Sequence, residues 1–137
     1  MLERKGKLTA KVVKDTSSST LTAEIIKTIK RTAELNTDEW LGYKGVSNIY
    51  KHTVVKHNEG EYVRGIAYTN NIEGFWALLK RGIYGIYHFA SKKHLQIYID
   101  EFVFRYNTRL QTETERFKNL LNNMAVRTTY RALVYGC

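Results

Sequence analysis

Hydrophobic and polar positions in the first half of the chain alternate at several points as they do in short β-strands. Residues 7–14 alternate weakly and are rich in β-branched side chains, which predicts a strand. The turn-like sequence Lys5-Gly6-Lys7 makes residues 1–4 the end of a preceding strand in a hairpin. Two further short strands are predicted at residues 34–37 and 50–56.

Other segments carry apolar residues three or four positions apart, which is the period of a helix. Such stripes predict helices at residues 21–33, 71–81, 91–106 and 112–124. A short helix interrupted by glycines is predicted at residues 40–49, and Ser91 is expected to cap the helix that follows it. With strands early and helices late, the pattern predicts a single α/β or α+β domain over residues 1–137.

Composition and charge narrow the class of protein. The chain has 137 residues, 43% of them hydrophobic and 26% charged, which is typical of one globular domain. Its net charge is +9, from 22 basic and 13 acidic residues. The excess of positive charge is spread evenly along the chain, with +4 over residues 1–69 and +5 over residues 70–137. A basic folded surface of this kind commonly meets nucleic acid or acidic lipid.

Several other classes are disfavoured. The longest dense apolar run, residues 75–79, is far shorter than the ~20 residues of a membrane-spanning helix. The only cysteine is Cys137, so the chain contains neither an internal disulfide nor a zinc site built from its own cysteines. No continuous apolar stretch opens the chain as in a signal peptide, and we expect a reducing cytoplasm as its compartment.

Four residues are candidates for chemistry: Asp38, Asn70, Glu73 and Lys80. Asp38 follows a predicted strand, and Glu73 lies in the first turn of a predicted helix. Lys80 is seven residues after Glu73, which is about 700° of helical rotation, so the two share a face ~10 Å apart. A carboxylate at the edge of a well-packed helix has the rigid support that a metal ligand needs.

The same residues also fit purely structural roles. Asn70-x-x-Glu73 is a capping-box pattern, with Asn70 before the helix and Glu73 reaching back to it. Asp38 fits the cap of the short helix expected after it. The spacing alone favours these structural roles over a metal site.

Five sequence motifs, which occur in a fixed order, alter this preference for structural roles. They are TDEWLGYKG from Thr37, GEYVRG from Gly60, TNNIEGFWALLKRG from Thr69, KHLQ from Lys93 and DEFVFRYNTR from Asp100. Together they resemble the ISXO-two-like family of bacterial insertion-sequence transposases, over about residues 6–121. The resemblance implies an RNase H-like α/β domain, which has a mixed sheet with flanking helices, and DNA transposition by DDE-type phosphoryl transfer.

The resemblance also assigns roles to residues. Asp38 matches the second catalytic aspartate and Glu73 the third acidic position, while Asn70 is a second choice for that third ligand. These carboxylates would hold Mg²⁺ or Mn²⁺, which activates the attacking oxygen and stabilises the leaving one. Lys80 matches a basic residue of the family and, with Arg81, would contact DNA phosphates.

The expected partners are therefore transposon-end and target DNA, together with a second copy of the chain or a full-length transposase. Lys44 and Arg64 flank the predicted site and are candidates to follow the DNA backbone. About half of the basic residues around the site are expected to be ordinary solvated charges.

The first catalytic aspartate of the family pattern is missing. Asp15 is the only aspartate before Asp38, and the 22 residues between them leave no room for the strands that the fold places there. Asp15 fits a turn instead. We therefore expect a chain truncated at its start, which lacks the first, central strand and is inactive or nearly so alone. Its sheet should have a gap, or a neighbour filling that gap, beside residues 34–37. The alternative function is a catalytically inactive DNA-binding remnant.

Aromatic residues and histidines are weaker candidates. Tyr84, Tyr87 and Phe89 could stack on bases, but packing into the core or a loop is the favoured interpretation. The four histidines show no helical spacing typical of metal ligands; they are His52, His57, His88 and His94.

Overall fold

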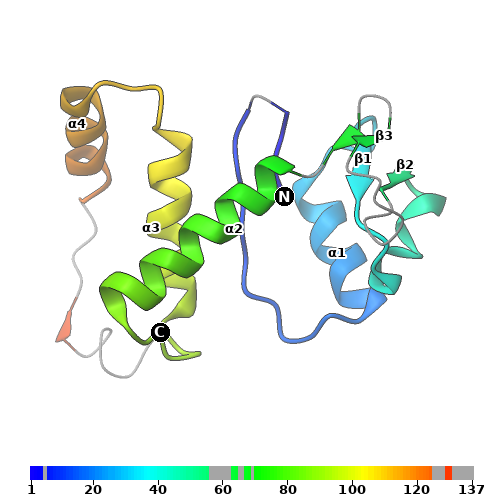
Figure 1. Ribbon diagram of the computed structural model, residues 1–137, viewed down its shortest axis with the longest axis horizontal. Coiled ribbons are helices and arrows are strands. Elements are labelled where there is room, and N and C mark those ends of the chain that lie inside the picture. The colour runs from blue at the N-terminus through cyan, green and yellow to red at the C-terminus, as the bar shows by residue number, and fades with distance from the viewer. Residues whose placement is uncertain (5, 56–62, 65–66, 69, 125–128, 131–137) are drawn as a thin grey trace.

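The computed structural model in Figure 1 describes residues 1–4, 6–55, 63–64, 67–68, 70–124 and 129–130. Its longer helices are α1 (Ser18–Thr28), α2 (Asn70–Gly82), α3 (Leu95–Asn107) and α4 (Glu113–Asn123). Its strands are β1 (Glu34–Thr37), β2 (Lys51–Val54), β3 (Val63–Arg64) and β4 (Ala67–Tyr68). The described residues also form two 3-10 turns, η1 (Leu41–Tyr43) and η2 (Val46–Asn48), and the π-helical turn η4 (Ile83–Tyr87). The predicted α/β class is confirmed.

The strands β1 and β2 form a parallel pair. Their register runs from Glu34 opposite Lys51 to Thr37 opposite Val54, and the Val55 N–H donates to the Thr37 carbonyl at 2.9 Å. The segment between the strands forms the two 3-10 turns, where a single helix with glycine breaks was predicted.

Within the described residues β1 has a paired strand on one edge only, and β3 and β4 form a separate antiparallel pair. The gap expected beside residues 34–37 and the full RNase H-like sheet both stay predictions.

The predicted hairpin at the N-terminus is present, but its second arm is not a regular strand. A single antiparallel bridge joins Leu2 to Leu8. The turn is closed by a hydrogen bond from the Gly6 N–H to the Glu3 carbonyl at 3.0 Å, and the Thr9 N–H donates to the Met1 carbonyl at 2.8 Å. Residues 9–14 continue from this bridge, and no strand among the described residues pairs with them.

Side chains of α3 take the place of that neighbouring strand. Asn107 accepts a hydrogen bond from the Leu8 N–H at 2.7 Å and donates one to the Leu8 carbonyl at 2.9 Å. Gln96 accepts from the Val12 N–H at 2.7 Å and donates to the Ala10 carbonyl at 3.2 Å. Leu8, Ala10 and Val12 alternate along an extended chain, so two amide side chains satisfy successive backbone groups on one edge.

Local capping explains where the helices begin. The Ser17 hydroxyl accepts from the Thr20 N–H and starts α1 three residues earlier than the apolar stripe predicted. Thr112 and Glu115 form a capping box at the start of α4. The prediction for Ser91 was wrong, because α3 begins at Leu95, after a turn in which the His94 N–H donates to the Ser91 carbonyl at 3.1 Å.

Two hydrophobic clusters hold the fold together. The first joins the hairpin to α2 and α3 through Leu8, Ala10, Phe75, Leu79, Ile99 and Phe102. The second joins α1 to the segment before β2 through Ile25, Val46 and Tyr50. Leu2 packs against the first cluster and Met1 against the second, so the hairpin contacts both. Figure 1 shows α2 running from the part of the molecule that holds the strands to α3.

Candidate functional site

Asp38 lies immediately after the carboxyl end of β1, in a hollow of about 240 Å³. The hollow is lined by Asp38, Glu39, Trp40, Leu41, Tyr43, Lys44, Ser47, His52 and Val54. Parallel pairing brings the carboxyl ends of β1 and β2 to the same edge, which is where ligands bind in open α/β sheets. The structure therefore brings two predicted site residues, Asp38 and Lys44, into one hollow.

The Asp38 carboxylate has one structural role as well. Its Oδ1 accepts a hydrogen bond from the Trp40 N–H at 3.2 Å, which fixes the turn after β1. The helix-cap role considered for Asp38 was wrong, since Trp40 precedes η1 and no side chain caps that turn. The phenol of Tyr43 lies close by, and its pKa is raised by burial and further by the charge of Asp38.

A hydrogen-bond network beneath Asp38 includes a residue that the sequence did not single out. The Thr37 hydroxyl donates to the Asp38 carbonyl at 2.8 Å and also contacts His52 Nε2 at 2.8 Å. A hydroxyl has one proton to donate, so Nε2 must carry the proton given to Thr37. His52 Nδ1 then accepts from the Ser47 hydroxyl at 2.8 Å. Burial lowers the pKa of His52, which agrees with this neutral tautomer.

The signal that would have identified His52 is the parallel pairing itself. His52 stands opposite Leu35, which shares a strand face with Thr37, so the His52 ring reaches the Thr37 hydroxyl. A search for metal ligands at helical spacing misses a histidine that strand pairing brings to the neighbour of an aspartate.

Glu73, Lys80 and Arg81 lie on α2, as predicted from the apolar stripe. All three are exposed, and buried Phe75 and Leu79 anchor the helix to the first cluster. Glu73 and Lys80 lie on one continuous helix, about 10 Å apart along its axis. Asn70 is the first residue of α2, so it does not stand before the helix as the capping-box interpretation required. Arg64 lies in β3.

The donor chemistry of Asp38 and Glu73 suits a hard cation. Mg²⁺ is commonly held by one or two carboxylates together with substrate phosphates and water. Among the described residues no three His, Cys, Asp or Glu side chains lie close enough to hold a metal ion together. Asp38 lines the hollow at the end of β1, whereas Glu73 lies on α2 and is not among the residues that line that hollow.

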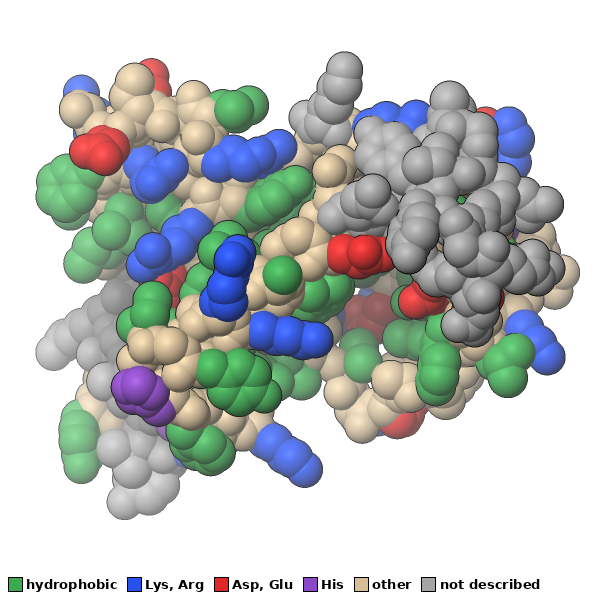
Figure 2. Space-filling model, in the orientation of Figure 1, with side chains coloured by type: hydrophobic (Ala, Val, Ile, Leu, Met, Phe, Trp, Pro, Cys, Tyr) green, Lys and Arg blue, Asp and Glu red, His purple; other side chains and the backbone are tan. Residues whose placement is uncertain are grey.

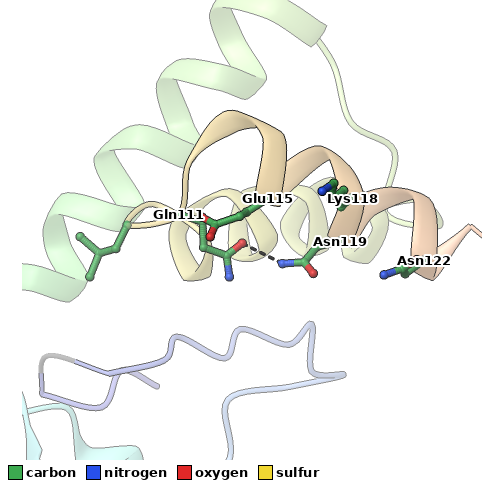
Figure 3. A pocket seen from close by; sticks show the side chains of 6 residues that line it. Gln111, Glu115, Lys118, Asn119 and Asn122 are labelled. Carbon is green, nitrogen blue, oxygen red and sulfur yellow. Dashed lines mark hydrogen bonds between the residues drawn. The ribbon is translucent and has the colours of Figure 1, made fainter.

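A second hollow lies elsewhere and contains none of the predicted site residues. It measures about 470 Å³ and is lined by Leu110, Gln111, Glu115, Lys118, Asn119 and Asn122, as Figure 3 shows. Side chains that line this hollow already form hydrogen bonds within the fold. Asn119 donates to Gln111 at 2.8 Å, and Glu115 belongs to the capping box of α4. This hollow belongs to the structure of α4.

The surface agrees with a polyanionic partner. Figure 2 shows Lys and Arg side chains spread over the part of the visible face that carries α2, α3 and α4. In the part of the molecule that holds the strands, the acidic residue Glu34 forms an ion pair with Lys51 across β1 and β2. None of the helices formed by the described residues is long and apolar enough to cross a membrane.

Comparison with known proteins identifies the family. The sequence model of the ISXO2-like transposase domain matches residues 1–107, which include the hairpin, the Asp38 hollow and both α2 and α3. No curated protein and no solved structure matches the chain. Because the match covers well over half of the sequence, the chain belongs to the family of ISXO2-like transposase domains.

Proposed function

We propose that this transposase-family chain takes part in metal-dependent cleavage and joining of DNA strands at transposon ends. Asp38 and Glu73 are the carboxylates that hold the divalent ion, Mg²⁺ or Mn²⁺. The observation that carries the proposal is the position of Asp38 in a hollow at the carboxyl ends of two parallel strands, beside Lys44.

Each residue contributes a separate task. The bound ion would supply Lewis-acid stabilisation of charge on the transferring phosphoryl group. Asp38 is oriented by its hydrogen bond to the Trp40 N–H, and the Thr37–His52 network fixes the backbone at Asp38. Lys80 and Arg81 hold DNA phosphates two helical turns from Glu73, with Lys44 and Arg64 on the flanks. Asn70 remains the second choice for the position of Glu73.

The test is nicking of supercoiled plasmid by the purified chain in Mg²⁺ or Mn²⁺. We expect slow nicking, because two carboxylates bind a divalent ion less tightly than three. Asp38→Asn and Glu73→Gln should each abolish it while DNA binding persists. Glu39→Gln is the matched control, since it removes the same charge from the same hollow and should leave nicking unchanged.

A second candidate function is DNA binding without cleavage. It is favoured by the lack of a three-ligand cluster among the described residues. Under this alternative the folded chain binds plasmid with a steep salt dependence and does not nick it in either metal. Nicking that Asp38→Asn leaves unchanged would contradict both functions as stated and indicate a contaminating nuclease.

We further propose that the chain works as an oligomer, with a second copy covering α4. The apolar stripe of α4 is exposed at Phe117, Leu120, Leu121 and Met124, although it has the spacing of a packed helix face. Light scattering should give a mass above that of one chain, and Phe117→Ser should lower it.

A further inference from the structure

The turn after α2 exposes two large aromatic rings that the sequence favoured as packed. Tyr84 and Phe89 are each 74% exposed, and Ile86 between them is 65% exposed. We call Tyr84 and Phe89 the aromatic tip. Tyr87, in contrast, turns inward: its hydroxyl donates to the Glu101 carboxylate and its ring lies 4.7 Å from that of Tyr98. Large apolar groups exposed together commonly mark an interaction site.

The backbone holds the aromatic tip in a defined shape. Residues 83–87 form the π-helical turn η4, and His88 follows with a φ of 59°. The His88 Nδ1–H donates to the Tyr84 carbonyl at 3.1 Å, and the Phe89 N–H donates to the Tyr87 carbonyl. π-Turns and non-glycine residues at positive φ occur often at functional sites, where the surrounding contacts offset their strain. The backbone conformation and its hydrogen bonds therefore fix the turn that carries the two exposed rings.

The charge around the aromatic tip selects the class of partner. Between Glu73 and Asp100 the sequence has no acidic residue and four basic ones, which are Lys80, Arg81, Lys92 and Lys93. The carboxylate of Glu101 is neutralised by Arg105 at 2.6 Å. A partner that offers both negative charge and flat ring faces is single-stranded nucleic acid, which binds basic grooves and stacks its bases on aromatic side chains.

The aromatic tip also continues the face proposed above for phosphate contacts. Tyr84 lies four residues after Lys80 and eleven after Glu73, which is about 16 Å along the helix. At the rise of about 3.4 Å per nucleotide that one strand has in stacked double-stranded DNA, this length spans about five nucleotides. We infer that an unpaired DNA strand lies along the exposed face of α2 and stacks a base on Tyr84 and another on Phe89. This inference rests on the proposed function, since it places the reacting phosphate near Glu73.

The experiment compares two labelled 15-mers by fluorescence anisotropy in EDTA, one of thymidines and one abasic with the same phosphates. Base stacking on one aromatic ring is worth about 1–3 kcal/mol, or about 5- to 150-fold in affinity. Tyr84→Ala and Phe89→Ala should each weaken thymidine 15-mer binding by such a factor and leave abasic binding unchanged. Tyr84→Phe should retain binding. Ile86→Ala is the matched control, because it removes an exposed apolar side chain without a ring face from the same turn.

Three results would overturn the inference. Equal losses on both 15-mers would mean a general loss of charge contact or of folding, which circular dichroism separates. Unchanged binding to the thymidine 15-mer, with weaker binding to phosphatidylglycerol vesicles, would assign the tip to a membrane surface. Unchanged DNA binding with a lower mass by light scattering would assign it to a second copy. Because the assay contains no metal, Asp38→Asn should bind the thymidine 15-mer like the wild type, so failed nicking and failed stacking are distinguishable.

Discussion

Replacement of Gly82 by alanine tests how closely α2 approaches α3. Gly82 has helical dihedral angles, φ −65° and ψ −46°, so it is not required for backbone freedom. A Cβ at this position would lie 2.7 Å from Cε1 of Phe102 and closer still to its Cζ. Phe102 is buried in the first cluster and cannot swing into solvent.

The magnitude follows from two opposed effects. Alanine in a helix is favoured over glycine by about 0.5–1 kcal/mol. Forcing a methyl group into a packed interface costs about 1–3 kcal/mol. The steric cost should exceed the gain in helix preference, so we expect Gly82→Ala to lower the free energy of unfolding by about 1–2 kcal/mol. The shift of α2 should also displace Glu73 and reduce nicking.

The control is Gly74→Ala in the same helix. A Cβ there meets no heavy atom within 4 Å, so only the helix preference acts and the variant should gain about 0.5–1 kcal/mol. Urea unfolding followed by circular dichroism measures both variants. In a Phe102→Leu background the cost of Gly82→Ala should shrink. A Gly82→Ala protein as stable as Gly74→Ala would refute the steric argument.

Three other predictions concern stability and pH. Asn107→Ala removes both hydrogen bonds to the buried Leu8 and should cost about 1–3 kcal/mol in urea unfolding; a cost below about 0.5 kcal/mol would contradict the edge-capping role. Because burial lowers the pKa of His52, the unfolded chain takes up its proton first, so stability should fall as pH drops below about 6.5 and level off below the folded pKa. His52→Gln should remove that part of the slope between pH 5 and 8. Hydrogen bonds from the hydroxyls of Ser17 and Thr20 and from the Ser17 N–H lower the pKa of Asp15 to about 2. The contribution of Asp15 to folding stability is therefore present above its ordinary pKa and lost as pH falls through about 2. An NMR titration of Asp15 near its ordinary pKa would contradict this prediction.

Local periodicity predicted the elements best where burial is regular. The stripe through Phe75 and Leu79 placed a helix at residues 71–81, and α2 runs from Asn70 to Gly82. The strand at residues 34–37 was confirmed with the same bounds. Asp15 was expected in a turn, and its carboxylate accepts from the Ser17 N–H at 3.0 Å.

Features set by distant partners could not be predicted from such patterns. The alternation in residues 7–14 predicts a strand but does not show that amide side chains of α3 take its outer edge. Apolar content favoured packing of Tyr84 and Phe89, whereas the π-helical turn directs them outward. His52 was only a weak candidate in the sequence, because its contact with Thr37 depends on the pairing of β2 with β1. Lys44 was expected to flank the predicted site, and it lines the same hollow as Asp38.

The amide caps on the hairpin have a consequence for folding during synthesis. The ribosome adds Asn107 99 residues after Leu8. At about 5–20 residues per second the ribosome needs on the order of 5–20 s to supply this cap. During that interval the hairpin presents an open backbone edge, which is a template for pairing with strands of other nascent chains. Yield in cells should therefore depend on translation speed and chaperones, and variants at Asn107 should aggregate during synthesis more than their equilibrium stability indicates.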